Sequence, residues 1–212
     1  MEPDIGKSMR DTLLSPALSD LLNEYSETAL DAVTDSNLIR EIPILNTIYA
    51  IGKTYSSIRD YRFAKKMMLF IRSMQSLSQG EREELVRKLE SDTSHAENVG
   101  EIIADLISKI DGNTKPLLVA EALKLYAKSE ISSQELIRLN NAIDKFLLCD
   151  ANFLEMLNDE YIMAPDSDNA AAHNLLNSGM AYEIKLYDGS KILPTKIGRL
   201  FLVLLNSIKA KI

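Results

Sequence analysis

Cysteine, tryptophan and histidine are scarce in this sequence. Its 212 residues include one Cys, two His and no Trp, which excludes a disulfide framework and a zinc site built on cysteines. A single Cys also fits a reducing compartment. Glycine is low, at 8 residues, and aromatic residues make up 6%. Because Leu, Ile, Ala, Ser, Glu and Lys are abundant instead, the composition favours helices over an open sheet.

Residues suited to catalysis are correspondingly few. His95 and His173 are far apart in the sequence, and Cys149 has no histidine near it. We expect His95 to be solvated, His173 to be partly buried, and Cys149 to be a buried apolar thiol. Glycine-rich phosphate loops, the Gly-x-Ser-x-Gly turn and a complete calcium loop are missing. The sequence therefore predicts a protein that is not an enzyme, with no catalytic residue, cofactor or bound metal.

The charge balance argues against nucleic acid as the main partner. The chain carries 24 Lys and Arg against 31 Asp and Glu, a net charge of -7, whereas affinity for phosphate backbones comes largely from cations. Residues 1–40 hold three cations and eight anions, and residues 41–80 hold six cations and two anions. Only the second segment is therefore strongly basic.

Neither a signal peptide nor a membrane span is expected. The chain opens with Glu2 and Asp4, not with a basic segment that leads into an apolar one. The longest apolar-rich run, residues 42–51, contains Pro43, Asn46 and Thr47, and it is shorter than the roughly 20 residues that a span requires. We expect a cytoplasmic protein.

Apolar residues recur at spacings of three and four over most of residues 15–146, as is typical of amphipathic helices. Helix starts are predicted at Ser15-Pro16, at Thr114, and at two capping boxes, Ser94-His95-Ala96-Glu97 and Ser132-Ser133-Gln134-Glu135. Residues 1–149 therefore predict an antiparallel helical array with short connections.

The pattern changes in residues 150–212. Residues 153–163 and 170–178 predict two short helices, the second closed by Gly179 at its C′ position. Strand alternation over residues 182–187 and the pair Asp188-Gly189 then predict a β-hairpin whose second strand is residues 190–193.

A last helix is expected after Pro194-Thr195. The order helix, helix, hairpin, helix is typical of a winged-helix module. The predicted fold class is thus mainly α: an antiparallel helical array over residues 1–149, followed by a small winged-helix-like α+β module over residues 150–212.

Residues 42–66 combine an apolar stripe with a group of cations. The stripe consists of Ile44, Ile48, Ile51 and Ile58, and the cations are Lys53, Arg59, Arg62 and Lys66. One helix is expected to run from Ile44 to Leu77, where a five-residue step separates this stripe from a second one. The second stripe consists of Phe63, Met67, Phe70 and Met74. We expect the second stripe to pack inside the domain and the first to be more exposed, carrying a protein partner, a second subunit or a membrane surface.

The cations have two interpretations. A basic amphipathic helix can meet anionic lipid or an acidic partner. Alternatively, these cations complement the acidic first helix of their own chain, which contains Asp20, Glu24, Glu27, Asp31 and Asp35.

Two short segments resemble patterns found in bacterial and prophage helical proteins of abortive-infection type that have a winged-helix-like C-terminal tail, and a third is similar to the start of the last helix in many winged helices. These are Ile-Pro-Ile-Leu-Asn-Thr-Ile at residues 42–48, Ser-Ile-Arg-Asp-Tyr-Arg-Phe-Ala-Lys-Lys at 57–66, and Leu-Pro-Thr-Lys-Ile-Gly-Arg at 193–199. The resemblance implies a bacterial or prophage origin and a role in phage conflict. It transfers no catalytic or binding residue.

The predicted function is that of a non-enzymatic bacterial interaction protein, linked to phage conflict or defence, that acts through helix-mediated contacts with a protein partner or a second copy. One alternative is a membrane-associating defence effector, peripheral to the inner membrane, that uses residues 42–66. The other is a winged-helix transcriptional regulator. We expect no reading of DNA sequence, because residues 169–178 contain no Arg or Lys to contact base edges.

Overall fold

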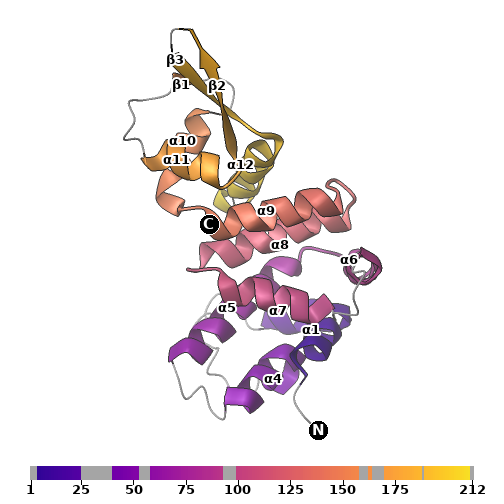
Figure 1. Cartoon of the computed structure of the whole chain (residues 1–212). Coiled ribbons are helices and arrows are strands. Elements are labelled where there is room, and N and C mark those ends of the chain that lie inside the picture. Colours follow the sequence, from indigo (N-terminus) through magenta and orange to yellow (C-terminus); the bar gives the residue numbers. More distant parts are fainter. Residues whose placement is uncertain are drawn as a thin grey trace. The chain divides into compact units, whose positions relative to one another are not determined.

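The computed structural model describes residues 4–24, 40–52, 58–92, 99–157, 162–163, 170–187 and 189–210. Over these residues the protein is mainly helical, with a small antiparallel sheet near the C-terminus (Figure 1). This confirms the helical class and the C-terminal hairpin. The chain separates into two compact units, residues 1–131 and 132–212, whereas the sequence placed the boundary at 149/150.

Unit 1 contains only helices among its described residues. They are α1 (Ile5–Leu14), α2 (Leu18–Glu24), α4 (Pro43–Gly52), α5 (Ile58–Met74), α6 (Gln79–Asp92), α7 (Val99–Lys109) and α8 (Thr114–Ala127). Helix α1 packs against α4, α6 and α7, and α5 packs against α4, α7 and α8. The core of this unit therefore forms around α1 and α5.

The helix expected to run from Ile44 to Leu77 is two helices, α4 and α5. Residues 53–57 between them lie outside the described residues. Helices α4 and α5 pack against each other, which the halves of one straight helix cannot do. The break allows both apolar stripes to face the interior of the same unit, so the expectation of one continuous helix was wrong.

Unit 2 places a hairpin between helices. Its elements are α9 (Ser133–Lys145), a 3-10 turn η3 (Leu148–Asp150), α10 (Ala151–Met156), β1 (Ile162–Met163), α11 (Ala170–Asn177), β2 (Ala181–Leu186), β3 (Gly189–Pro194) and α12 (Lys196–Lys209). The antiparallel sheet has the strand order β1-β3-β2. Helix α9 packs on α12, where the buried rings of Phe146 and Phe201 lie 4.5 Å apart between centroids. For this reason the compact unit begins before α9.

Of the predicted helix starts, those at Ser132 and Thr195 are confirmed, whereas Ser15 is the C-cap of α1 and α2 begins at Leu18. Ser132 and Glu135 form the predicted capping box at the start of α9. Thr195 caps α12 by accepting a hydrogen bond from the backbone N–H of Gly198. Helix α8 begins at Thr114, but its N-cap is Asn113 and no side chain caps it. The predicted box at Ser94-Glu97 lies outside the described residues.

The hairpin ends and the last helix meet at Gly198. A Cβ atom on this residue would lie 2.1 Å from the carbonyl oxygen of Met180, a separation that no side chain tolerates. The backbone N–H of Thr195 also donates to that oxygen at 2.9 Å. Glycine at this position therefore lets α12 begin directly against the base of β2.

Cationic side chains of α5 and α6 close the carboxyl ends of other helices in unit 1. Lys66 Nζ donates to two carbonyl oxygens at the end of α7, at 3.2 and 2.9 Å. Lys88 Nζ donates to two carbonyl oxygens at the end of α8, at 2.9 and 3.0 Å. Such carbonyls have no partner within their own helix and carry the negative end of its dipole. Each lysine therefore adds hydrogen bonds to these carbonyls and opposes a partial negative charge; the Tyr126 carbonyl also accepts from the backbone N–H of Ser129 at 3.0 Å.

Arg82 does the same at the end of α1, with its side chain buried. Its Nε donates to Leu13 O at 2.9 Å, Nη1 to Leu77 O at 2.8 Å, and Nη2 to Ser15 O at 3.2 Å. The residue is only 2% exposed, and this burial lowers the pKa of its guanidinium from the ordinary value. The guanidinium joins α1, the end of α5 and α6 through backbone acceptors.

We predict that Arg82→Met lowers the free energy of unfolding by about 2 to 6 kcal/mol, because it removes the side-chain donors to the buried carbonyls of Leu13 and Leu77. Urea denaturation of the full chain measures this change. The matched control is Arg87→Met on the same helix. Arg87 is exposed and pairs with Glu84, so its removal is expected to change stability far less than the removal of Arg82. Equal losses in the two variants would contradict the role of Arg82.

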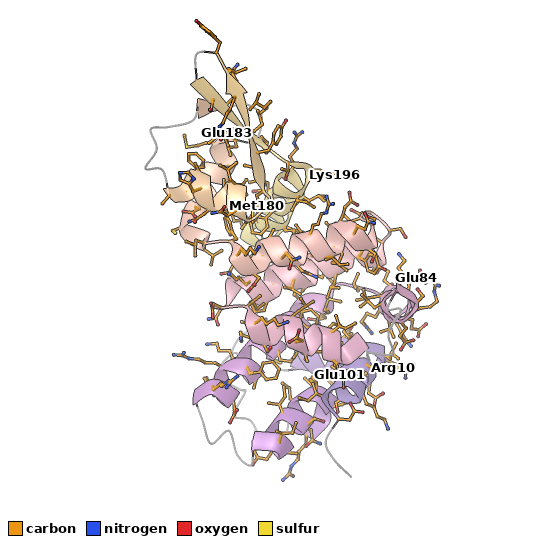
Figure 2. All side chains as sticks on the ribbon, in the orientation of Figure 1. Arg10, Glu84, Glu101, Met180, Glu183 and Lys196 are labelled. Carbon is orange, nitrogen blue, oxygen red and sulfur yellow. The ribbon has the colours of Figure 1, made fainter. Side chains whose placement is uncertain are left out.

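In unit 2, Glu135 joins the start of α9 to the start of α12. Its carboxylate forms an ion pair with Lys196, which Figure 2 shows at the beginning of α12. It also accepts from the backbone N–H of Ser132 at 2.8 Å and from the Ser132 hydroxyl at 2.9 Å. The hydrogen bond from Lys196 is the main cause, and the bonds from Ser132 the second, that lower the pKa of Glu135 to about 2.

A lowered pKa means that the folded state holds this proton less tightly than the unfolded chain does. The contribution of Glu135 is therefore complete above the ordinary value of 4.5 and is lost as the pH falls towards about 2. We predict that Glu135→Gln flattens the pH dependence of unfolding between these values. Lys196→Met should flatten it in part. Denaturation at stepped pH tests this, and an unchanged slope in both variants would refute it.

Candidate functional site

The apolar stripe that the sequence offered as an interface is largely core. Ile44 is 0% exposed and Ile48 is 5% exposed, so the expectation of an exposed stripe was wrong for these two residues. The cause is the packing of α4 against both α1 and α5, together with a hydrogen bond from the backbone N–H of Ile44 to Thr12 Oγ1 at 3.1 Å. Ile51 is 49% exposed.

The second stripe packs inside, as predicted. Met67, Phe70 and Met74 are fully buried, and Phe63 is half-buried. Ile58 and Lys53 were also proposed for the interface. The side chain of Ile58 and all of Lys53 lie outside the described residues.

Three of the predicted cations surround one cleft in unit 1. Arg59, Arg62 and Lys66 line a space of about 680 Å³ between α1, α5 and α7. The other residues that line it are Ile5, Asp60, Phe63, Ala104, Asp105 and Ser108. Arg59 and Arg62 are exposed. Lys66 is half-buried; burial, reinforced by Arg59 and opposed by Asp111, lowers its pKa.

The chemistry of this cleft is limited. The ammonium of Lys66 is already bound to the end of α7, and Asp105 is paired with Lys109. The Ser108 hydroxyl donates to the backbone carbonyl of Asp105 at 2.8 Å. The charges that line the cleft are thus mixed in sign and partly engaged.

The alternative interpretation is that these cations complement the acidic first helix, and most of the acidic side chains that it requires lie outside the described residues. Of the five acidic side chains involved, the structure describes Asp20, which is exposed. For Lys66 the observed partners are the backbone carbonyls of α7, and neither interpretation of the sequence included such acceptors.

His173 and Cys149 are both exposed, so the expectations of a partly buried histidine and a buried thiol were wrong. Cys149 lies in the 3-10 turn before α10, where the neighbouring Leu147 and Leu148 are also exposed, at 49% and 41%. Asp150, the last residue of the same turn, is buried. His95 lies outside the described residues, and within the described part of the chain no group of three or more His, Cys, Asp or Glu side chains is placed to hold a metal ion.

The hairpin of unit 2 presents an exposed apolar face. Tyr182, Ile184 and Leu186 alternate along β2 and therefore lie on the same side of the sheet; they are 43%, 42% and 41% exposed. Tyr187 follows in the turn and is fully exposed. We call Tyr182, Ile184, Leu186 and Tyr187 the hairpin face.

The opposite side of the hairpin faces the core at its base. Ala181, Ile192 and Pro194 lie on that side and are buried. Glu183, labelled on the hairpin in Figure 2, and Lys185 also lie on that side but are exposed. The sequence predicted the strand but not its exposed face. Alternation alone does not show which side of a strand is inside. The sequence signal for the buried side was the small residue Ala181, next to the large apolar residues of the other side.

Among the described residues, no helix is both long and apolar enough to traverse a lipid bilayer. Comparisons of this chain with protein-family models, with curated proteins and with solved structures found no match.

Proposed function

We propose that this chain is a non-enzymatic interaction protein and that it contacts another protein through the hairpin face of unit 2. One observation carries the proposal: three large apolar side chains of one strand, followed by an exposed tyrosine, form a contiguous exposed row. A soluble fold usually buries such a row or uses it for binding.

On the two longest helices of unit 2, α9 and α12, exposed large apolar residues stand singly. Ile137 on α9 is 58% exposed and Val203 on α12 is 54% exposed, but each is the only large apolar residue so exposed on its helix. Single exposed apolar side chains are ordinary on protein surfaces. The hairpin face differs because its members are neighbours on one strand, so a partner can cover them together.

The winged-helix-like character of unit 2 belongs to this proposal. Helix α11, the β2–β3 hairpin and α12 follow one another in the order of such a module, and the strand order β1-β3-β2 is compatible with it. In many winged helices, the helix before the hairpin reads DNA. In this chain that helix is α11, which contains no Arg or Lys. Its Asn174 amide donates to Asp150 Oδ2 at 2.9 Å. These features favour protein over DNA as the partner.

The proposed contact is made by the hairpin face, whereas the sequence predicted a contact through helices. Burial of Ile44 and Ile48 removes most of the apolar surface that a helix-mediated contact, or a membrane contact through residues 42–66, would use. Asp60 and Asp105 beside Arg59 and Arg62 also weaken attraction to anionic lipid. A role in phage conflict rests on the sequence resemblance alone.

We predict that a photoreactive phenylalanine analogue at Tyr187 forms protein cross-links in the native host, and that adding Ile184→Asp abolishes them. An aspartate in the centre of the face prevents its desolvation, while the exposed position tolerates the charge. Cross-links are detected by mass shift and identified by mass spectrometry.

The matched control is Val203→Asp, which introduces the same charge at a comparably exposed site of the same unit. It should leave the cross-links unchanged. Thermal unfolding should show both aspartate variants to be folded. Cross-links that survive Ile184→Asp, or the absence of any protein cross-link from Tyr187, would refute the proposed function.

A further inference from the structure

We infer that the partner of the hairpin is a second copy of this chain, joined edge to edge along β2 in one antiparallel register. This inference rests on the proposed function and names the partner of the same surface. It is carried by three observations: an open strand edge, the direction of the backbone groups along that edge, and the order of two charged side chains.

Strand β2 is an edge strand of its sheet. The order is β1-β3-β2, and no other described strand pairs with the outer edge of β2. An open edge presents unpaired N–H and C=O groups, which can accept a further strand.

The pairing of β2 with β3 determines which backbone groups point outwards. Leu186 pairs with Gly189 across a two-residue turn, and the pair next to such a turn exchanges hydrogen bonds across the hairpin. Because the direction alternates along the strand, the groups of Tyr182 and Ile184 also point towards β3. The groups of Ala181, Glu183 and Lys185 therefore point away from β3.

A second β2 can join this edge about a twofold axis only where outward groups meet outward groups. Near the middle of the strand this allows the axis to pass at residue 183, 184 or 185. An axis at 183 places Glu183 opposite the partner's Glu183, and an axis at 185 places Lys185 opposite the partner's Lys185. Like charges directly opposite each other are unfavourable in a sheet.

An axis at Ile184 places opposite charges across from each other. Glu183 then lies opposite the partner's Lys185, and Lys185 lies opposite the partner's Glu183, so that two ion pairs form across the new ladder. On the other side of the sheet, Tyr182 lies opposite the partner's Leu186 and Ile184 lies opposite its own copy. The two apolar rows become adjacent and cover part of each other, as a self-complementary interface requires.

The charges are available for this pairing. Glu183 and Lys185 are exposed, and neither forms an ion pair with another residue in the described ranges. Charged residues on an edge strand usually prevent edge-to-edge association. Here their opposite signs, two residues apart, permit one register and disfavour its neighbours.

The experiment is light scattering combined with size-exclusion chromatography of the full chain over a range of concentrations. We expect the natural chain to dimerise. Glu183→Lys and Lys185→Glu should each weaken dimerisation at least tenfold, because each places like charges opposite each other. The double variant Glu183→Lys/Lys185→Glu should restore it. Arg138→Glu, which reverses an exposed charge on α9, is the matched control and should have no effect.

Mixing the two single variants provides the sharpest test. In the register centred on Ile184, one copy then carries two lysines and the other two glutamates, all opposite complementary charges. The variants should therefore be monomeric alone and dimeric when mixed in equal amounts. Recovery on mixing also shows that each variant is folded.

A monomeric natural chain at all concentrations would overturn the inference. So would single variants that dimerise as well as the natural chain, or a mixture that stays monomeric. The proposed function is judged separately by the Tyr187 cross-links. If these join the chain to a different protein while the chain is monomeric, the inference fails and the proposed function stands.

Discussion

The carboxyl ends of helices, closed by cationic side chains from neighbouring helices, are the constraint on which unit 1 depends. Lys66, Arg82 and Lys88 each donate to backbone carbonyls at the end of another helix. A buried carbonyl at a helix end without a donor costs free energy comparable to a lost hydrogen bond. Arg82 is the most demanding case, because its charge is buried and balanced by carbonyl dipoles, with no carboxylate among its hydrogen-bond partners.

These hydrogen bonds give part of the basic segment a structural role. A cation that holds a helix end is a structural element, and Lys66 is no longer free to bind an external anion. The break between α4 and α5 has a similar effect on the apolar residues, because Ile44 and Phe70 are both fully buried within unit 1. Among the described residues, the contiguous exposed apolar row belongs to the hairpin of unit 2.

Local signals made much of the fold predictable. The capping box at Ser132 and Glu135, the cap at Thr195 and the hairpin around Asp188-Gly189 depend on residues close together in the sequence. The last helix carries a glycine at residue 198 for a reason that only the structure reveals: the contact with the Met180 carbonyl. Periodicity also identified the buried residues of α5, because helical spacing decides which side chains share a face.

Long-range packing was not predictable from one sequence. Ile44 and Ile48 are apolar at helical spacing whether they face a partner or their own core, and only the packing of α4 on α1 and α5 decides between the two. Likewise, nothing local distinguishes Lys66 as a helix cap from Arg59 as an exposed cation. The hairpin face was missed because alternation specifies two sides of a strand without specifying which is buried.

Amide hydrogen exchange at low and high protein concentration shows whether the chain associates through β2 or through the basic helices. We expect exchange over residues 181–186 to slow as the concentration rises, while exchange over residues 58–66 stays unchanged. Slowing confined to residues 43–66, or no dependence on concentration along β2, would contradict association through β2.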